Sequence, residues 1–247
     1  EDEKIKKCGH NIKFDVEVME SAGVKVKGIY FDTMIASYLL NPGTRQHNLD
    51  ALAFSELGFE KISKEDLLGK GKDKITFPEV PLEKLYLYSC EDADFTFRLE
   101  KKLEGQLKKE KLESLFAKIE MPLVEVLVEM EKNGIRIDEK LLGKIRKEAE
   151  EKIKKLEEKI KKEAKTDFNI NSTQQLREVL FTKMGISALG IAKGKTGFST
   201  SASELEKLRF EHPIIEAIME YRELAKLLNT YINALPELVS KKTGRLH

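Results

Sequence analysis

Residues 88–94 read Tyr-Ser-Cys-Glu-Asp-Ala-Asp, and they place a carboxylate on the apolar side of a predicted helix. Pro81 can open this helix at its first position. Apolar residues then recur with helical spacing at Leu82, Leu85, Tyr88, Phe95 and Leu99. Asp92 follows Tyr88 by one helical turn, so both side chains leave the same face. A carboxylate there needs a counter-charge, hydrogen-bond donors or a metal ion, which leaves a structural ion pair and a metal site both open.

The composition sets bounds on domain number and on partners. A chain of 247 residues with 40% hydrophobic content can bury a core in one large or two medium domains. Its 44 Lys and Arg against 43 Asp and Glu leave a net charge of +1, so any surface for nucleic acid would have to be local. The charged fraction of 35%, dominated by Lys and Glu, favours a thermophilic source.

Cysteines and apolar runs indicate the compartment. Cys8, Cys90 and four scattered histidines give neither a disulfide framework nor zinc spacing, which favours a reducing cytoplasm. No apolar run approaches the roughly 20 residues that cross a bilayer, and no signal-type segment opens the chain. We therefore expect a cytoplasmic protein that does not enter a membrane. The start at Glu1 instead of methionine hints at an excised piece.

Turn and cap residues predict a helix early in the chain. Gly9 and Asn11 precede a helix that we expect to start at Ile12, with Asp15 in its first turn. Asp15 in that position can complement the helix dipole or serve as a functional carboxylate.

The following stretches predict a mixed α/β region. Residues 24–28 alternate like a short strand, and residues 31–40 and 49–57 have helical spacing. Residues 62–74 are rich in lysine and glycine and predict an exposed loop.

The second half of the chain predicts long helices. We place a domain boundary near residue 117, which gives domains 1–117 and 118–247. One helix after it has a predicted inner face of Ile119, Leu123, Leu127 and Met130. Asp138 then caps a long charged helix, and Pro213 opens the last one. Ser172 with Gln175 and Ser201 with Glu204 predict two capping boxes. Residues 190–197 form a basic loop whose glycine spacing does not fit a phosphate-binding loop.

Several of these stretches together resemble family A DNA polymerases, the bacterial DNA polymerase I group. Residues 7–15 and 88–92 are similar to that family's second and third exonuclease motifs. Further similar stretches follow in the family's order at 31–34, 47–52, 91–94, 120–123, 133–135, 168–172 and 243–247. The resemblance implies an α/β, partial ribonuclease H-like 3′–5′ exonuclease domain, mostly its helical back half, at 1–117. A mainly α-helical thumb region from the start of the polymerase domain would follow at 118–247.

The resemblance also implies an activity and a cofactor. Members are DNA-directed DNA polymerases with a two-metal 3′–5′ proofreading exonuclease, and they act in DNA replication and repair. Asp15 and Asp92 match carboxylates that hold Mg²⁺ or Mn²⁺, and Tyr88 matches the tyrosine that orients the attacking water. The first exonuclease motif is expected upstream of Glu1, and the palm and fingers beyond His247. The resemblance therefore implies a fragment that is inactive alone, with a two-metal site completed by upstream residues.

DNA is the partner that the resemblance implies. Asn11 is the candidate for contact with the single-stranded 3′ end, and a plain helix cap is its alternative. The candidates for gripping the primer-template through phosphates are Lys193, Lys195, Ser199, Thr200, Arg222, Lys226 and Asn229. Deoxynucleotides would bind only with the palm and fingers, and we expect a monomer. The alternative function is a non-catalytic DNA-binding scaffold with a decayed nuclease half.

Overall fold

The computed structural model describes the backbone of residues 1–247 and the side chains of all of them except Lys72. The chain divides into two compact units, Glu1–Asn133 and Gly134–His247. The division comes later than the predicted boundary near 117, because helix α7 (Met121–Asn133) belongs to the first unit. Its buried residues Met121, Val124 and Val128 join the core of that unit.

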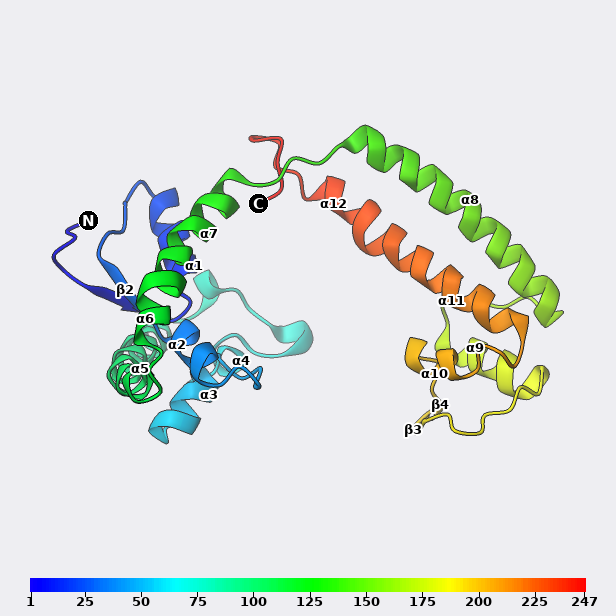
Figure 1. The fold of residues 1–247 in the computed structure, drawn as a ribbon, viewed down its shortest axis with the longest axis horizontal. Helices are drawn as coiled ribbons and strands as arrows, with labels where there is room; N and C mark the ends of the chain where they lie inside the picture. Colours follow the sequence, from blue (N-terminus) through cyan, green and yellow to red (C-terminus); the bar gives the residue numbers. More distant parts are fainter. The chain divides into compact units, whose positions relative to one another are not determined.

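A parallel pair of strands begins the first unit (Figure 1). Strand β1 (Lys7–Gly9) pairs with β2 (Ile29–Asp32), and helix α1 (Ile12–Ser21) makes the crossover that parallel neighbours require. The prediction of a strand at 24–28 was wrong by a few residues. Gly28 has a φ of +73°, outside the strand region, whereas Phe31 is buried in the core opposite Cys8.

Helices make up the rest of the first unit. They are α2 (Thr33–Leu40), α3 (Leu49–Leu52), η1 (Ala53–Leu57), α4 (Lys64–Leu68), η2 (Gly71–Asp73), η3 (Phe77–Glu79), α5 (Leu82–Lys109), α6 (Glu113–Leu115), η4 (Phe116–Glu120) and α7. The helix predicted at 49–57 is present as α3 and η1, and it ends at Gly58 with a φ of +76°.

The stretch at 62–74 is not simply the exposed loop that its composition predicts. Ser63 and Asp66 form a reciprocal capping box at the start of α4. Leu67 and Leu68 are buried, and with Val80 they pack against Tyr88 of α5. Apolar burial outweighs the lysine and glycine content here, so this segment covers the first turns of α5.

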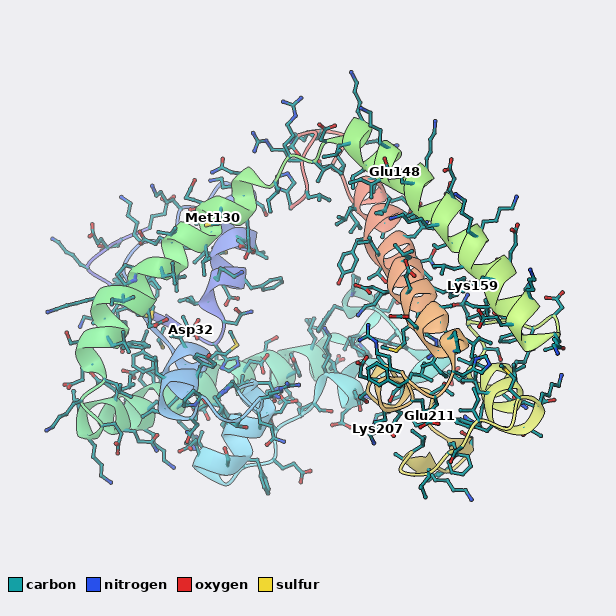
Figure 2. The ribbon with its side chains drawn as sticks, turned by 45° about the vertical axis from the view of Figure 1, so that its right-hand side comes forward. Asp32, Met130, Glu148, Lys159, Lys207 and Glu211 are labelled. Atoms are coloured by element: carbon teal, nitrogen blue, oxygen red, sulfur yellow. The ribbon has the colours of Figure 1, made fainter. Side chains whose placement is uncertain are left out.

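Helix α7 buries a different face from the predicted one. Ile119 and Met130 were expected to point inward, but they are 58% and 62% exposed; Met130 is labelled on α7 in Figure 2. The helix carries apolar residues on more than one side, and the side with Val124 and Val128 packs in the core, where α1 lies against the helix.

Two long helices, α8 (Glu139–Ala164) and α11 (Pro213–Lys226), lie side by side in the second unit (Figure 1). The other elements are α9 (Thr173–Arg177), η5 (Glu178–Lys183), the antiparallel strands β3 (Lys193–Gly194) and β4 (Gly197–Phe198), α10 (Ala202–Lys207), η6 (Leu227–Ile232) and α12 (Ala234–Glu237). Asp138 caps α8 as predicted, since its carboxylate accepts a hydrogen bond of 3.0 Å from the Leu141 amide. No helix among the described residues is long and apolar enough to cross a membrane.

The two predicted capping boxes are not formed reciprocally, although α9 and α10 begin where expected. Ser172 accepts from the Gln175 amide, but the Gln175 side chain accepts from a loop amide instead of returning the bond. Ser201 makes no capping bond, and the Glu204 carboxylate accepts from the Ala192 amide at 2.9 Å. Both side chains hold neighbouring loops.

Candidate functional site

An open cleft of about 1220 Å³ in the first unit contains all four residues predicted for the nuclease site. Asn11 and Asp15 reach it from the start of α1, and Tyr88 and Asp92 reach it from α5. Two segments far apart in the sequence therefore meet in one place. Residues that the sequence did not single out, among them His10, Asp50 and Lys61, also line the cleft.

Asp32 fixes the start of α1 beside the cleft. Its carboxylate is 1% exposed and accepts from the amides of Asn11 at 3.2 Å and Ile12 at 2.8 Å. The same carboxylate accepts from the amides of Met34 at 2.8 Å and Ile35 at 3.2 Å, so it caps α1 and α2 together. Figure 2 labels Asp32 among the helices of the first unit.

Asn11 stands at the N-cap position of α1, as its alternative interpretation predicted, but its side chain makes no capping hydrogen bond. Its φ of +57° lies in the left-handed region, which asparagine tolerates. Because the Asp32 carboxylate caps α1, the side chain of Asn11 is not needed as a cap, and Asn11 lines the cleft.

Burial and two nearby carboxylates affect the ionisation of Asp15. Partial burial raises the pKa of the Asp15 carboxyl, and the charges of Asp32 and Asp92 raise it further against one local backbone hydrogen bond. Like charges that face a common space are relieved by a cation between them.

Asp92 has a lysine as its partner. The Lys61 ammonium lies 2.8 Å from Asp92 Oδ1 and 3.3 Å from Asp50 Oδ1. It donates to the Ile62 carbonyl at 2.8 Å and lies 4.1 Å from the centroid of the Tyr88 ring. The Lys61 side chain is 1% exposed, whereas that of Asp92 is 36% exposed. The ion-pair alternative for Asp92 is therefore realised in this structure.

The charges of the pair affect its neighbours. Burial alone would lower the pKa of the Lys61 ammonium, but the hydrogen bond and charge of Asp92, with Tyr88 and Asp50, raise it above its ordinary value. Burial raises the pKa of the Tyr88 hydroxyl, and the charge of Asp92 adds to this effect. Burial also lowers the pKa of His10, whose Nδ1 lies 2.9 Å from Thr33 Oγ1.

The donors in the cleft fit part of a metal site. Asp92 Oδ1 is buried and has the Lys61 ammonium at 2.8 Å as its partner, and Asp15, Asp50 and Asp92 offer the hard oxygen ligands that Mg²⁺ and Mn²⁺ prefer. Among the described residues, no group of three or more His, Cys, Asp or Glu side chains stands close enough to hold a metal ion. The carboxylates present are thus suitable ligands that form an incomplete set.

The second unit holds the residues predicted to grip duplex DNA. Lys193 and Lys195 are exposed on the β3–β4 hairpin, and Lys226 and Asn229 are exposed at the end of α11 and in η6. Ser199, which follows β4, is half-buried.

Thr200 and Arg222 are engaged inside this unit. Thr200 is 4% exposed, and the Arg222 guanidinium donates to its carbonyl and lies 3.5 Å from its hydroxyl. Burial lowers the pKa of Arg222. These two residues tie the loop to α11 in the conformation described here, and their contact with DNA phosphates stays a prediction.

The β3–β4 hairpin is held in place by Arg177. Arg177 donates to the Phe198 carbonyl at 2.7 Å and to the Thr196 carbonyl. Gly197 has a φ of +122°, and a Cβ there would lie 2.9 Å from Arg177 Cδ. Glycine is required at this position, and the hairpin presents Lys193 and Lys195 from a fixed base.

Comparisons with known proteins identify the two units. The family model described as 3′–5′ exonuclease matches residues 1–108, and the one described as DNA polymerase family A matches residues 139–247. DNA polymerase I of Chloroflexus aurantiacus is 46% identical over 247 residues, covering 98% of this chain. Those of Pseudomonas aeruginosa and Geobacillus stearothermophilus are 38% and 36% identical, each covering 100% of it. The chain spans 26 to 28% of the length of these three relatives.

A solved structure supports the same assignment. The POL domain of Pol1 from M. smegmatis, in complex with DNA primer-template and dNTP, is similar with a TM-score of 0.72 and 27% identity. The match covers 100% of this chain and 39% of that one. The two family models match consecutive parts of the chain, and relatives named DNA polymerase I match it along nearly its whole length. The chain therefore belongs to the family A DNA polymerases.

Proposed function

We propose that this chain forms part of a DNA-directed DNA polymerase with 3′–5′ proofreading activity that works in DNA replication and repair. The first unit would be part of a ribonuclease H-like exonuclease domain, and the second would belong to the polymerase thumb. One observation carries the proposal: Asp15, Tyr88 and Asp92, which come from two distant segments, line one cleft together with Asn11. The relatives named DNA polymerase I support it.

In this proposal the chain's own residues bind and orient a single-stranded 3′ end. Mg²⁺ or Mn²⁺ ions, when bound, would activate a water and stabilise the leaving oxygen of the phosphodiester. Asp15 and Asp92 would hold these ions, together with carboxylates that this chain does not supply. The Tyr88 hydroxyl would orient the attacking water, and the Asn11 amide would hydrogen-bond the terminal nucleotide.

The second unit would hold primer-template DNA without reading its sequence. Phosphate contacts position a duplex, and the accessible polar side chains of this unit suit that task. They are the exposed Lys193, Lys195, Lys226 and Asn229 and the half-buried Ser199. The DNA complex of the M. smegmatis POL domain supports this role. We expect a monomer, and we expect deoxynucleotides to bind only with further parts of the polymerase.

Replacing Asp92 tests the nuclease half of the proposal. In the longest natural polypeptide that contains this chain, Asp92→Ala should reduce excision of a mismatched 3′ end by several orders of magnitude and leave polymerisation nearly normal. Tyr88→Phe should reduce excision by roughly 10 to 100-fold, because it removes one orienting hydrogen bond.

Asp94→Ala is the matched control, since Asp94 lies on the same helix but pairs with Arg98 and does not line the cleft. We expect normal excision in this variant. Equal excision by the Asp92→Ala and unsubstituted proteins would overturn the assignment. An unsubstituted protein that binds the 3′ end without excising it would favour the scaffold alternative.

A further inference from the structure

The Lys61 ammonium is surrounded by oxygens in a way that suits a small cation. Carboxylate oxygens of Asp92 and Asp50 lie 2.8 Å and 3.3 Å from it, and the Ile62 carbonyl lies at 2.8 Å. Carboxylate and carbonyl oxygens are also the ligands that hard divalent cations take. Lys61 thus fills a place that offers two negative charges and one dipole to a cation.

This place is built into the fold. The Glu91 carboxylate accepts a hydrogen bond of 2.8 Å from the Ile62 amide, which fixes the backbone directly after Lys61. The Lys61 ammonium also lies over the Tyr88 ring, and its side chain is 1% exposed. A buried lysine held by so many partners is far more restrained than the surface lysines around it.

The two carboxylates remain open to the cleft while the lysine is beneath them. The side chains of Asp92 and Asp50 are 36% and 49% exposed, and both line the cleft. A metal ion entering from solvent can therefore reach the two carboxylates that the ammonium already neutralises, although Asp92 Oδ1 itself is buried. Two cations that contact the same Asp92 carboxylate stand close enough to repel each other strongly.

We propose that the Lys61 ammonium and a divalent metal ion compete for Asp92, so that a metal ion binds there only after the Lys61 side chain has withdrawn. The inference rests on the proposed nuclease function and adds a control step to its site. A site that is competent a tenth of the time binds its ligand about tenfold more weakly. Lys61 would therefore weaken metal binding in the resting chain while keeping the carboxylates paired.

Binding of Mn²⁺, measured by electron paramagnetic resonance on the chain of 247 residues, tests this competition. Lys61→Ala should bind Mn²⁺ about tenfold more tightly than the unsubstituted chain. Lys61→Arg keeps the charge and should bind like the unsubstituted chain. The double variant Lys61→Ala, Asp92→Asn should lose the gain.

Lys64→Ala is the matched control for charge. Lys64 also lines the cleft, but its ammonium lies over the Phe77 ring and makes no ion pair with Asp92. Its removal should change Mn²⁺ affinity by less than about threefold, because solvent and salt screen charges that are not in contact.

Thermal unfolding gives a second readout that does not depend on activity. In EDTA, Lys61→Ala should melt below the unsubstituted chain, because Asp92 and Asp50 lose their counter-charge. Saturating Mg²⁺ should raise the melting temperature of the variant by about 2 to 4 °C and change that of the unsubstituted chain much less. If alanine at this position prevents folding, Lys61→Gln keeps most of the side chain and takes its place in both measurements.

Each result decides the matter. Unchanged Mn²⁺ affinity in Lys61→Ala, a gain that survives Asp92→Asn, or an equal gain in Lys64→Ala would overturn the competition. Variants that stay unfolded with and without Mg²⁺ would show that a metal ion cannot replace the ammonium, which also overturns it. None of these results bears on excision, so failure of this inference and failure of the nuclease assignment are distinguishable.

Discussion

Asp32→Ala should destabilise the first unit more than the loss of an ordinary helix cap. The Asp32 carboxylate accepts four backbone hydrogen bonds, two of 2.8 Å and two of 3.2 Å, at the starts of α1 and α2. It is 1% exposed, so water cannot readily take its place. The effect also reaches the cleft, because two of these amides belong to the start of α1, the helix that carries Asp15.

The magnitude follows from the two caps. Replacing a capping residue with alanine costs about 1 kcal/mol, and hydrogen bonds to a charged group are worth roughly 1.5 to 3 kcal/mol. Asp32 caps two helices in a buried position, so we expect the free energy of unfolding to fall by about 2 to 4 kcal/mol. Asp32→Asn keeps the shape of the side chain but offers a single acceptor oxygen. Its free energy of unfolding should lie between those of the unsubstituted protein and of Asp32→Ala.

Urea unfolding followed by circular dichroism measures this effect. With a slope of about 2 kcal/mol per molar urea, the middle of the typical range, the transition of the first unit should move down by roughly 1 to 2 M. Asn48→Ala is the control, since Asn48 is exposed and its side chain caps α3 through one bond of 2.9 Å to the Ala51 amide. Equal losses in Asp32→Ala and Asn48→Ala would refute the reasoning.

Two further predictions concern the second unit. Replacing Lys195 and Lys226 with alanine should weaken primer-template binding for every sequence and flatten its salt slope by up to about two units, as titrations at several salt concentrations can show; the same loss after replacing Lys152 and Lys159 would contradict it. The hydrogen bond from the Lys207 ammonium, and after it the one from the Ala192 amide, lower the pKa of the Glu204 carboxyl below its ordinary value of 4.5. Its stabilisation is therefore present above pH 4.5 and lost as the pH falls through the lowered pKa. The melting temperatures of the unsubstituted protein and of Glu204→Gln should differ near neutral pH and converge in acid. A difference that stays constant with pH would show that the charge of Glu204 does not stabilise the protein.

Features that depend on a few neighbouring residues could be predicted from the sequence. The start of α1 at Ile12 follows from the turn and cap residues directly before it, and the start of α11 follows from Pro213 at its first position. The cap of α8 by Asp138 is equally local. The pairing of Asp15 with Asp92 in one cleft came from the resemblance, since no spacing rule brings two such distant segments together.

Features that depend on distant contacts could not be predicted. Asp32 caps α1 from the end of β2, and nothing near Asn11 in the sequence points to it. The buried side of α7 was mistaken because apolar residues occupy more than one face of that helix, and only its neighbours in the core decide between them. The reciprocal capping boxes failed for a similar reason, since Gln175 and Glu204 found loop amides as partners.

Lys61 shows how such a contact can change the chemistry of a recognised motif. It precedes a lysine- and glycine-rich segment whose composition predicts an exposed loop, yet the burial of Leu67 and Leu68 brings this segment onto α5. That packing accompanies an ammonium at the carboxylate of Asp92, the place that we propose for a metal ion. The motif residues determine which oxygens are available, and the residues between the motifs determine which cation reaches them. Motif residues alone therefore indicate the candidate ligands of such a site. Whether an ammonium or a metal ion lies beside them depends on how the residues between the motifs fold.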